Sequence, residues 1–287
     1  AVGRLALSVN TTGVSNTCLG DQAGSDNTGS YNTLLGAISG NVGTGNYNVV
    51  AGYSAYNAAG DGGSNVAIGY DSMNANTGGD NNVGVGAVTL NANTTGDYNV
   101  AVGRSALAAN TTASNNTAVG KDALTANTTA SNNTAVGSGA MVASTTAGNN
   151  VAVGYHTLYD TTTGAGNTAV GYSAGALITT GANNVAIGNN ALDAVTTSGG
   201  NVAIGANALG VNTAVNNVGI GNACMDANTT GTAMVGIGYQ ALYANTTGTD
   251  NVGIGYQAGV ACTTSGANVL IGSYAGQAIT TGDNRMV

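Results

Sequence analysis

Apolar and polar residues follow one short pattern that recurs along the whole chain. A representative copy is Asn99-Val100-Ala101-Val102-Gly103, in which a polar residue, an apolar triplet and a glycine succeed one another. The alternation of β-branched and small residues is typical of a half-buried β-strand, and the glycine permits a sharp bend after it. We number positions from that glycine, position 0, so that Val102 is at −1 and Asn99 is at −4.

The glycine at position 0 recurs at a nearly constant spacing. Thirteen of the sixteen intervals are 17 residues long and the other three are 16. These glycines are Gly3, Gly20, Gly36, Gly52, Gly69, Gly86, Gly103, Gly120, Gly137, Gly154, Gly171, Gly188, Gly205, Gly221, Gly238, Gly255 and Gly272. So strict a period indicates one unit stacked on itself. We therefore predict an all-β parallel β-solenoid (β-roll) of about 17 coils, with residues 1–287 forming one continuous module.

Position −4 is asparagine in nearly every coil. Identical amides stacked at the strand spacing are expected to hydrogen-bond from coil to coil, and so to hold the coils in register. The predicted Asn ladder consists of Asn65, Asn82, Asn99, Asn116, Asn133, Asn150, Asn167, Asn184 and Asn201.

Position −2 is Ala or Gly in twelve successive coils. If the β-branched residues at −3 and −1 point into the coil, position −2 points outward, and a flat stripe of small residues would let another chain approach closely. The predicted chain-packing column is Ala101, Ala118, Ala135, Ala152, Ala169, Ala186 and Ala203. The alternative is that small residues simply suit a thin coil.

The residues after the glycine suggest a second short strand. Ala at +3 and Leu or Met at +4 recur, as in Ala106-Leu107, and turn-forming residues such as N-T-T-G close the coil. Where +4 is glycine instead, +7 becomes apolar: the pairs are Gly175 with Ile178, Gly259 with Cys262 and Gly276 with Ile279. Losing a buried leucine costs ~2–5 kcal/mol, so we expect the residue at +7 to fill the same interior. Gly24 and Gly40 lack this replacement.

Composition agrees with a thin solenoid. The chain has 48 Gly, no Pro, Phe or Trp, and 43% apolar residues, so it lacks the bulky side chains that fill a wide globule. Its formal charge of −8 disfavours nucleic acid and anionic lipid as partners. We find no apolar run long enough to span a membrane. Cys18, Cys224 and Cys262 occupy different positions of the repeat, and we interpret them as small apolar fillers rather than an interchain bridge or reactive thiols.

Candidate chemistry is sparse, and we expect neither an enzyme nor a cofactor. His156 is the only histidine. Asp80 and Asp97 share a position in adjacent coils, where they would either hold Ca²⁺ loosely or be solvated turn residues. The Thr-Thr pairs offer at most one outward column, which weakens an ice-binding hypothesis. Tyrosines at +1 come in neighbouring pairs, which would stabilise each other across coils or offer platforms to sugars.

The N-V-A-I-G core at residues 65–69, 184–188 and 201–205 resembles the head repeats of YadA-like trimeric autotransporter adhesins. The longer form, typified by Asn99–Leu107, is similar to repeats of phage and bacterial tail-fibre-type proteins. The resemblance implies a left-handed coil and a homotrimer. The adhesin repeats are shorter, and neither an anchor barrel nor a coiled-coil stalk lies in these residues.

We therefore expect a non-enzymatic structural shaft or head of an extracellular fibre that mediates attachment. Its partners would be copies of itself and a cell-surface glycan or protein receptor. One alternative is a secreted subunit that polymerises head to tail into a filament, because the chain begins and ends in matching positions of the repeat. Another is an ice- or glycan-binding solenoid.

Overall fold

The computed structural model describes residues 1–58 and 60–287, and in this part of the chain it contains sixteen strands of three residues and no helix. The chain divides into two compact units, Ala1–Thr146 and Ala147–Val287. Each unit is described here by itself.

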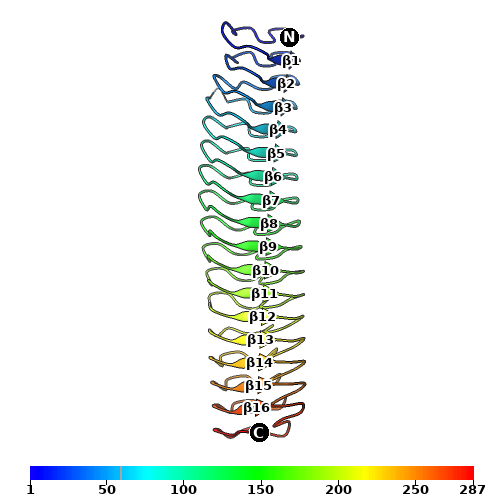
Figure 1. Ribbon diagram of the computed structural model, residues 1–287, viewed down its shortest axis with the longest axis vertical. Coiled ribbons are helices and arrows are strands. Elements are labelled where there is room, and N and C mark those ends of the chain that lie inside the picture. The colour runs from blue at the N-terminus through cyan, green and yellow to red at the C-terminus, as the bar shows by residue number, and fades with distance from the viewer. Residues whose placement is uncertain (59) are drawn as a thin grey trace. The chain divides into compact units, whose positions relative to one another are not determined.

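The first unit contains a parallel ladder of eight strands in chain order (Figure 1). Its strands are β1 (Thr17–Leu19), β2 (Thr33–Leu35), β3 (Val49–Ala51), β4 (Val66–Ile68), β5 (Val83–Val85), β6 (Val100–Val102), β7 (Thr117–Val119) and β8 (Thr134–Val136). Each residue pairs with the residue at the same position of the next coil, as Ala101 does with Ala118. Val2 adds an isolated parallel bridge to Leu19.

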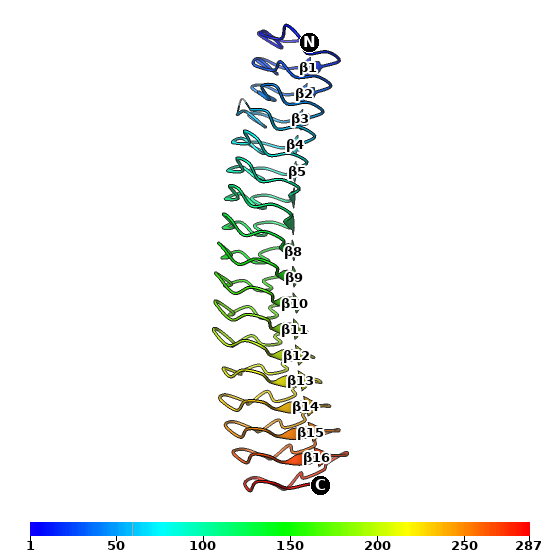
Figure 2. The ribbon, with the colours of Figure 1, turned by 60° about the vertical axis from the view of Figure 1, so that its left-hand side comes forward.

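The second unit repeats this arrangement (Figure 2). Its strands are β9 (Val151–Val153), β10 (Thr168–Val170), β11 (Val185–Ile187), β12 (Val202–Ile204), β13 (Val218–Ile220), β14 (Val235–Ile237), β15 (Val252–Ile254) and β16 (Val269–Ile271). The predicted parallel β-solenoid with one repeat per coil is thus confirmed.

The interior of the coil holds the small residues, so the predicted orientation of the strand is wrong. In every strand the middle residue, at −2, is buried, whereas the residues at −3 and −1 are exposed or half-buried. The Ala column from Ala101 to Ala203 therefore lies in the core and offers no surface to another chain. The reason is lack of room, because a Cβ added at Gly219 would lie only 3.1 Å from Cγ of Leu209. The leucine at +4 fills the coil from the opposite side.

The segment after the glycine is a chain of turns, so the predicted second strand is also absent. Within one coil the N–H of Ala106 donates to the carbonyl of Gly103, and Leu107 has a φ of 51°, in the left-handed region. The N–H of Leu107 instead donates to the carbonyl of Ala123 in the next coil. Turns whose third residue has a positive φ put Ala and Leu side by side in the core, which an extended strand cannot do.

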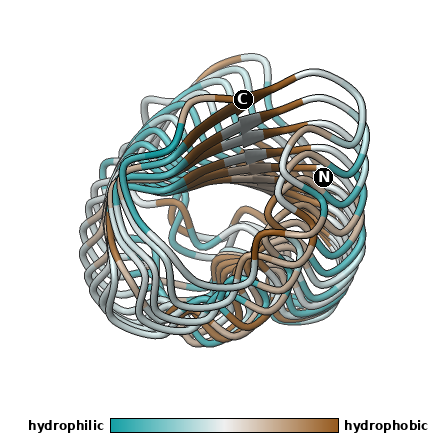
Figure 3. Cartoon of the chain, turned by 90° about the horizontal axis from the view of Figure 1, so that it is seen from below, coloured by the Kyte–Doolittle hydropathy of each residue, from teal (hydrophilic) through white to brown (hydrophobic). Residues whose placement is uncertain are grey.

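Hydropathy follows this anatomy. Viewed along the stack, the strands are strongly hydrophobic, while many of the turns that close each coil are hydrophilic (Figure 3). Leu34 shows how the interior adapts in the coils that lack a leucine at +4. Its side chain approaches both Gly24 and Gly40, where an added Cβ would lie 2.7 Å and 2.3 Å from its methyl carbons. A large residue at −2, Leu34, thus fills the space that a leucine at +4 would occupy in these coils.

Candidate functional site

The outer face of the strands is the most regular surface of each unit. In the first unit it is formed by Thr17, Leu19, Thr33, Leu35, Val49, Ala51, Val66, Ile68, Val83, Val85, Val100, Val102, Thr117, Val119, Thr134 and Val136. In the second unit it is formed by Val151, Val153, Thr168, Val170, Val185, Ile187, Val202, Ile204, Val218, Ile220, Val235, Ile237, Val252, Ile254, Val269 and Ile271. We call these two columns, at −3 and −1, the outer strand face.

The outer strand face carries no charged side chain and is largely apolar, with threonine at −3 in five strands. Ile68 is 39% exposed and Ile271 is 59% exposed, and the other members are exposed or half-buried. β-Branched side chains are stiff, so the face presents a fixed array of methyl groups with one step per coil. Contiguous apolar surface of this kind marks an interaction site.

The glycine at position 0 allows the coils to stack closely beside this face. Gly103 has a φ of 122°, in the region that favours glycine. A Cβ added there would lie 2.7 Å from the carbonyl carbon and oxygen of Gly120 in the next coil. A side chain at this position would therefore push the coils apart and break the register of both outer columns.

The predicted Asn ladder at −4 runs from coil to coil, although the backbone supplies most of its donors. The N–H of Asn99 donates to Oδ1 of Asn82 at 2.9 Å, and Nδ2 of Asn99 donates to the carbonyl of Ala113 at 2.8 Å. The same pattern recurs at Asn65, Asn82 and Asn116 in the first unit and at Asn167, Asn184 and Asn201 in the second. These side chains are buried, so the ladder fixes the start of each strand.

A second buried Asn ladder lies at +7, and sequence reasoning missed it. Nδ2 of Asn110 donates to Oδ1 of Asn93 at 2.8 Å and to the carbonyl of Ala113 at 3.0 Å. Asn127 and Asn93 make the corresponding bonds. The N-T-T segments were interpreted as turns, yet their asparagines recur at one position just as those at −4 do. Because Asn110 is fully buried, folding also withdraws this N-T-T amide from any glycosylating enzyme.

The threonines of the same segments divide into an inner and an outer column. Oγ1 of Thr94 donates to the carbonyl of Thr111 in the next coil at 3.0 Å, and Thr111 and Thr128 continue this row. Thr95 and Thr112, one residue further, are exposed. The expectation of one outward threonine column is therefore confirmed.

The tyrosines at +1 stack in the pairs that the sequence predicts. The ring centroids of Tyr53 and Tyr70 are 6.0 Å apart, those of Tyr155 and Tyr172 are 5.4 Å apart, and those of Tyr239 and Tyr256 are 5.2 Å apart. All six rings are exposed. Within each unit they lie beside the outer strand face, separated from it in the chain by the glycine at position 0.

The candidate polar groups serve the fold. His156 is half-buried, with its ring 3.9 Å from that of Tyr155 and 4.5 Å from that of Tyr159. Oδ1 of Asp80 accepts the N–H of Gly63 at 2.7 Å, and Oδ1 of Asp97 accepts the N–H of Asp80 at 2.8 Å. Each of these carboxylates therefore bonds the backbone of the preceding coil.

The three cysteines are free and buried, as the filler interpretation predicts. Burial raises the pKa of the Cys224 thiol to about 12, and burial also raises the pKa of Cys18 and of Cys262. A thiol with a raised pKa is a poor nucleophile at neutral pH. None of the three is placed for covalent catalysis.

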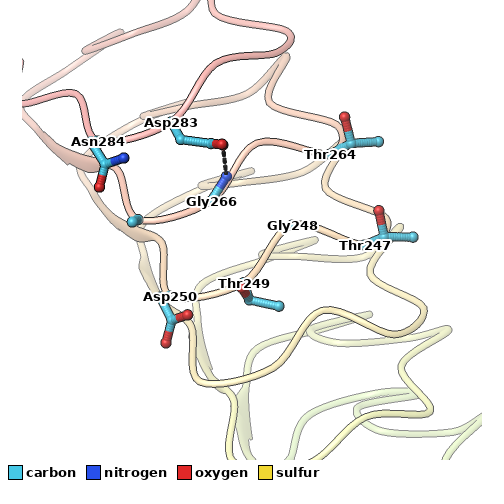
Figure 4. Close-up of a pocket in the computed structure, with 9 residues that line it drawn as sticks. Thr247, Gly248, Thr249, Asp250, Thr264, Gly266, Asp283 and Asn284 are labelled. Atoms are coloured by element: carbon cyan, nitrogen blue, oxygen red, sulfur yellow. Dashed lines mark hydrogen bonds between the residues drawn. The ribbon is translucent and has the colours of Figure 1, made fainter.

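A shallow hollow of about 310 Å³ lies on the turns of the second unit (Figure 4). Thr247 and Thr264 stand on one side of it, and Asp250 and Asn284 on the other. Oδ1 of Asp283 accepts the N–H of Gly266 at 2.7 Å. The lining contains hydroxyl, amide and carboxylate groups but no histidine, cysteine or lysine.

Residues 1–58 and 60–287 lack two further features. Within those residues no three His, Cys, Asp or Glu side chains gather as metal ligands would. Nor does this described part of the chain contain a helix long and apolar enough to cross a bilayer. Comparison with models of known protein families and with curated proteins found no match for the chain. The function of the chain is therefore inferred from its fold and its surface chemistry.

Proposed function

We propose that this chain is a non-enzymatic structural protein, a β-solenoid segment of an extracellular fibre that mediates attachment. The observation that carries the proposal is the outer strand face, which presents an apolar side chain at −1 and a Val or Thr at −3 in every strand of each unit, without a charge. A protein that works as a single soluble chain has little use for such a surface, whereas a fibre that assembles from several chains requires one.

The outer strand face takes over the role that the sequence pattern assigned to the Ala column. It has two parallel columns, so the −3 column of one copy can pack against the −1 column of the next. Heterologous side-by-side contacts of this kind close into a ring when the rotation fits, and three parallel copies make the homotrimer that the resemblance to adhesin and tail-fibre repeats implies. Each coil of one copy then meets the equivalent coil of its neighbours.

The absence of a catalytic role is part of the proposal. The single histidine packs between tyrosine rings, the thiols are buried, and the hollow on the turns is lined by no histidine, cysteine or lysine. The extracellular location follows from the resemblance, as does a receptor that is a cell-surface glycan or protein.

Multi-angle light scattering of the purified chain tests the assembly. We expect three times the chain mass of 27.5 kDa. Val102→Lys in the first unit and Ile204→Lys in the second place charges on the outer strand face, so both variants should be folded monomers by circular dichroism. Thr112→Lys, on the exposed threonine column, is the matched control and should remain trimeric.

A wild-type chain that stays at the monomer mass at micromolar concentration would overturn the trimer, as would trimers of both lysine variants. A mass that grows without limit with concentration, together with long filaments in negative stain, would favour head-to-tail polymerisation instead.

A further inference from the structure

The tyrosine column of the second unit is interrupted over three coils. Position +1 is tyrosine at residues 155 and 172, and again at residues 239 and 256. Between the two pairs it is Asn189, Ala206 and Asn222. At one coil per ~4.8 Å, Tyr172 and Tyr239 are about 19 Å apart along the stack.

The two pairs border this interruption with exposed, stacked rings. Tyr155 and Tyr172 belong to adjacent coils and stack with an interplanar angle of 19°. Tyr239 and Tyr256 do the same at 16°. Tyr172 is the member of its pair in the coil next to that of Asn189, and Tyr239 is the member of its pair in the coil next to that of Asn222. Tyr172 is the more exposed of its pair, at 54% against 46%.

The surface between the two rings is uncharged and rich in amides. Asn189 and Asn222 are exposed, and so is Asn207, which follows Ala206 in the middle coil. A primary amide offers two donors and one acceptor group in a plane. Ala206, in the middle coil, has a small side chain, so it does not obstruct a ligand that reaches from Tyr172 to Tyr239.

We propose that this interrupted tyrosine column, defined by Tyr172, Asn189, Ala206, Asn207, Asn222 and Tyr239, binds a neutral oligosaccharide. A pyranose has an apolar face of C–H groups, which stacks on an aromatic ring, and a rim of hydroxyls, which exchange hydrogen bonds with amides. A short saccharide lying along the stack meets an aromatic face at each end and amides between them. The chain's net charge of −8 and the nearby Asp193 and Asp226 favour neutral over anionic glycans.

This inference deepens the attachment role proposed above by naming the chemical class of the receptor. Assembly and saccharide binding have separate measurements, light scattering and calorimetry, so either can fail without the other. The interrupted column lies within the second unit and is set apart from the outer strand face by the glycine at position 0.

Isothermal titration calorimetry of the full chain tests the site, with maltohexaose, cellohexaose, mannohexaose and chitohexaose as neutral probes and a hyaluronan hexasaccharide as the anionic one. We expect binding of at least one neutral probe. Loss of one stacking ring in Tyr172→Ala or Tyr239→Ala should weaken it about three- to tenfold. Ala206→Tyr should abolish it, because a ring at the centre divides the space between Tyr172 and Tyr239, at a position that tolerates tyrosine in other coils.

Tyr70→Ala is the matched control, since Tyr70 is an exposed, stacked tyrosine at +1 in the first unit, which has no second tyrosine pair at that position. It should bind the probe as the wild type does. The proposal is overturned if no neutral probe binds, if only the hyaluronan probe binds, or if Tyr70→Ala weakens binding as much as Tyr172→Ala. Binding that survives Ala206→Tyr would overturn it equally.

Discussion

Ile178 occupies the space beside Gly175 that a leucine fills in other coils. Its Cδ1 lies 2.9 Å from the point where a Cβ on Gly175 would be, and Cδ2 of Leu158 lies 3.1 Å from the same point. Ile178 is fully buried. The sequence exchange between positions +4 and +7 is thus confirmed as an exchange of volume inside the coil.

This exchange predicts a strong coupling between the two positions. Gly175→Leu alone should cost about 1–3 kcal/mol by overpacking, and Ile178→Asn alone about 2–5 kcal/mol by opening a cavity. The double variant installs the combination of Leu at +4 and Asn at +7 that other coils carry, as at Leu107 and Asn110, so it should recover much of both losses. Urea unfolding followed by circular dichroism measures the cycle, and losses that simply add would contradict a shared volume.

The orientation of the strand predicts opposite tolerance at adjacent residues. Ala118 is fully buried between Ala101 and Ala135, so Ala118→Leu should destabilise the fold by about 1–3 kcal/mol. Thr117 points to the outer strand face, where other coils carry valine, so Thr117→Val should change the free energy of unfolding by less than about 0.5 kcal/mol. Equal costs at both sites would mean that the core lies on neither side.

In the second Asn ladder, the side-chain amide of Asn245 has no hydrogen-bond partner. Both amide atoms of Asn245 are buried and unpaired, whereas Asn110 bonds Asn93 and Ala113. Asn245→Val should therefore stabilise the chain by about 1 kcal/mol, since an unpaired buried amide is costly and valine occurs naturally at this position as Val195. Asn110→Val should instead destabilise it by about 1–3 kcal/mol. Thermal unfolding of the two variants gives the comparison, and shifts of the same sign would refute it.

Two aspartates predict a decrease of stability with rising pH. Burial raises the pKa of the Asp226 carboxyl. Burial also raises the pKa of Asp193, and the negative charge of Asp226 raises it further. Each folded-state pKa lies above its unfolded value, so the folded chain binds protons more tightly. The free energy of unfolding therefore falls as the pH rises from the ordinary aspartate pKa through the raised one.

Asp226→Asn should flatten this fall and raise stability at neutral pH. Asp250→Asn, on the exposed turn of another coil, is the control and should leave the slope unchanged. Urea midpoints between pH 3 and 7 provide the measurement. A steeper fall in Asp226→Asn than in the wild type would show that the sign is wrong.

Burial of the thiols predicts that folding protects all three cysteines. The raised pKa values leave little thiolate at neutral pH, and the interior excludes reagent. Ellman's reagent should find no reactive thiol in the native chain and three in urea. Rapid reaction of any thiol without denaturant would place it outside the core.

Much of the architecture could be predicted because each coil repeats the same information. The glycine at position 0 and the asparagine at −4 recur at one period, and residues that recur at one period must form columns when units stack in register. The same logic would have found the second Asn ladder from Asn93, Asn110 and Asn127, had their segment not also suited a turn. The stacked tyrosine pairs followed from adjacency in one column.

The sequence by itself therefore determined the period, the parallel stacking and the membership of each column. Only the tertiary structure decided which side of the strand is inside. A triplet such as Val100-Ala101-Val102 alternates equally well either way, and turning it over exchanges core and surface for every residue at once. The choice is made by the leucine at +4, which fills the narrow coil from the opposite side and leaves room for no more than alanine at −2 in most coils. The valines and isoleucines are thereby left outside.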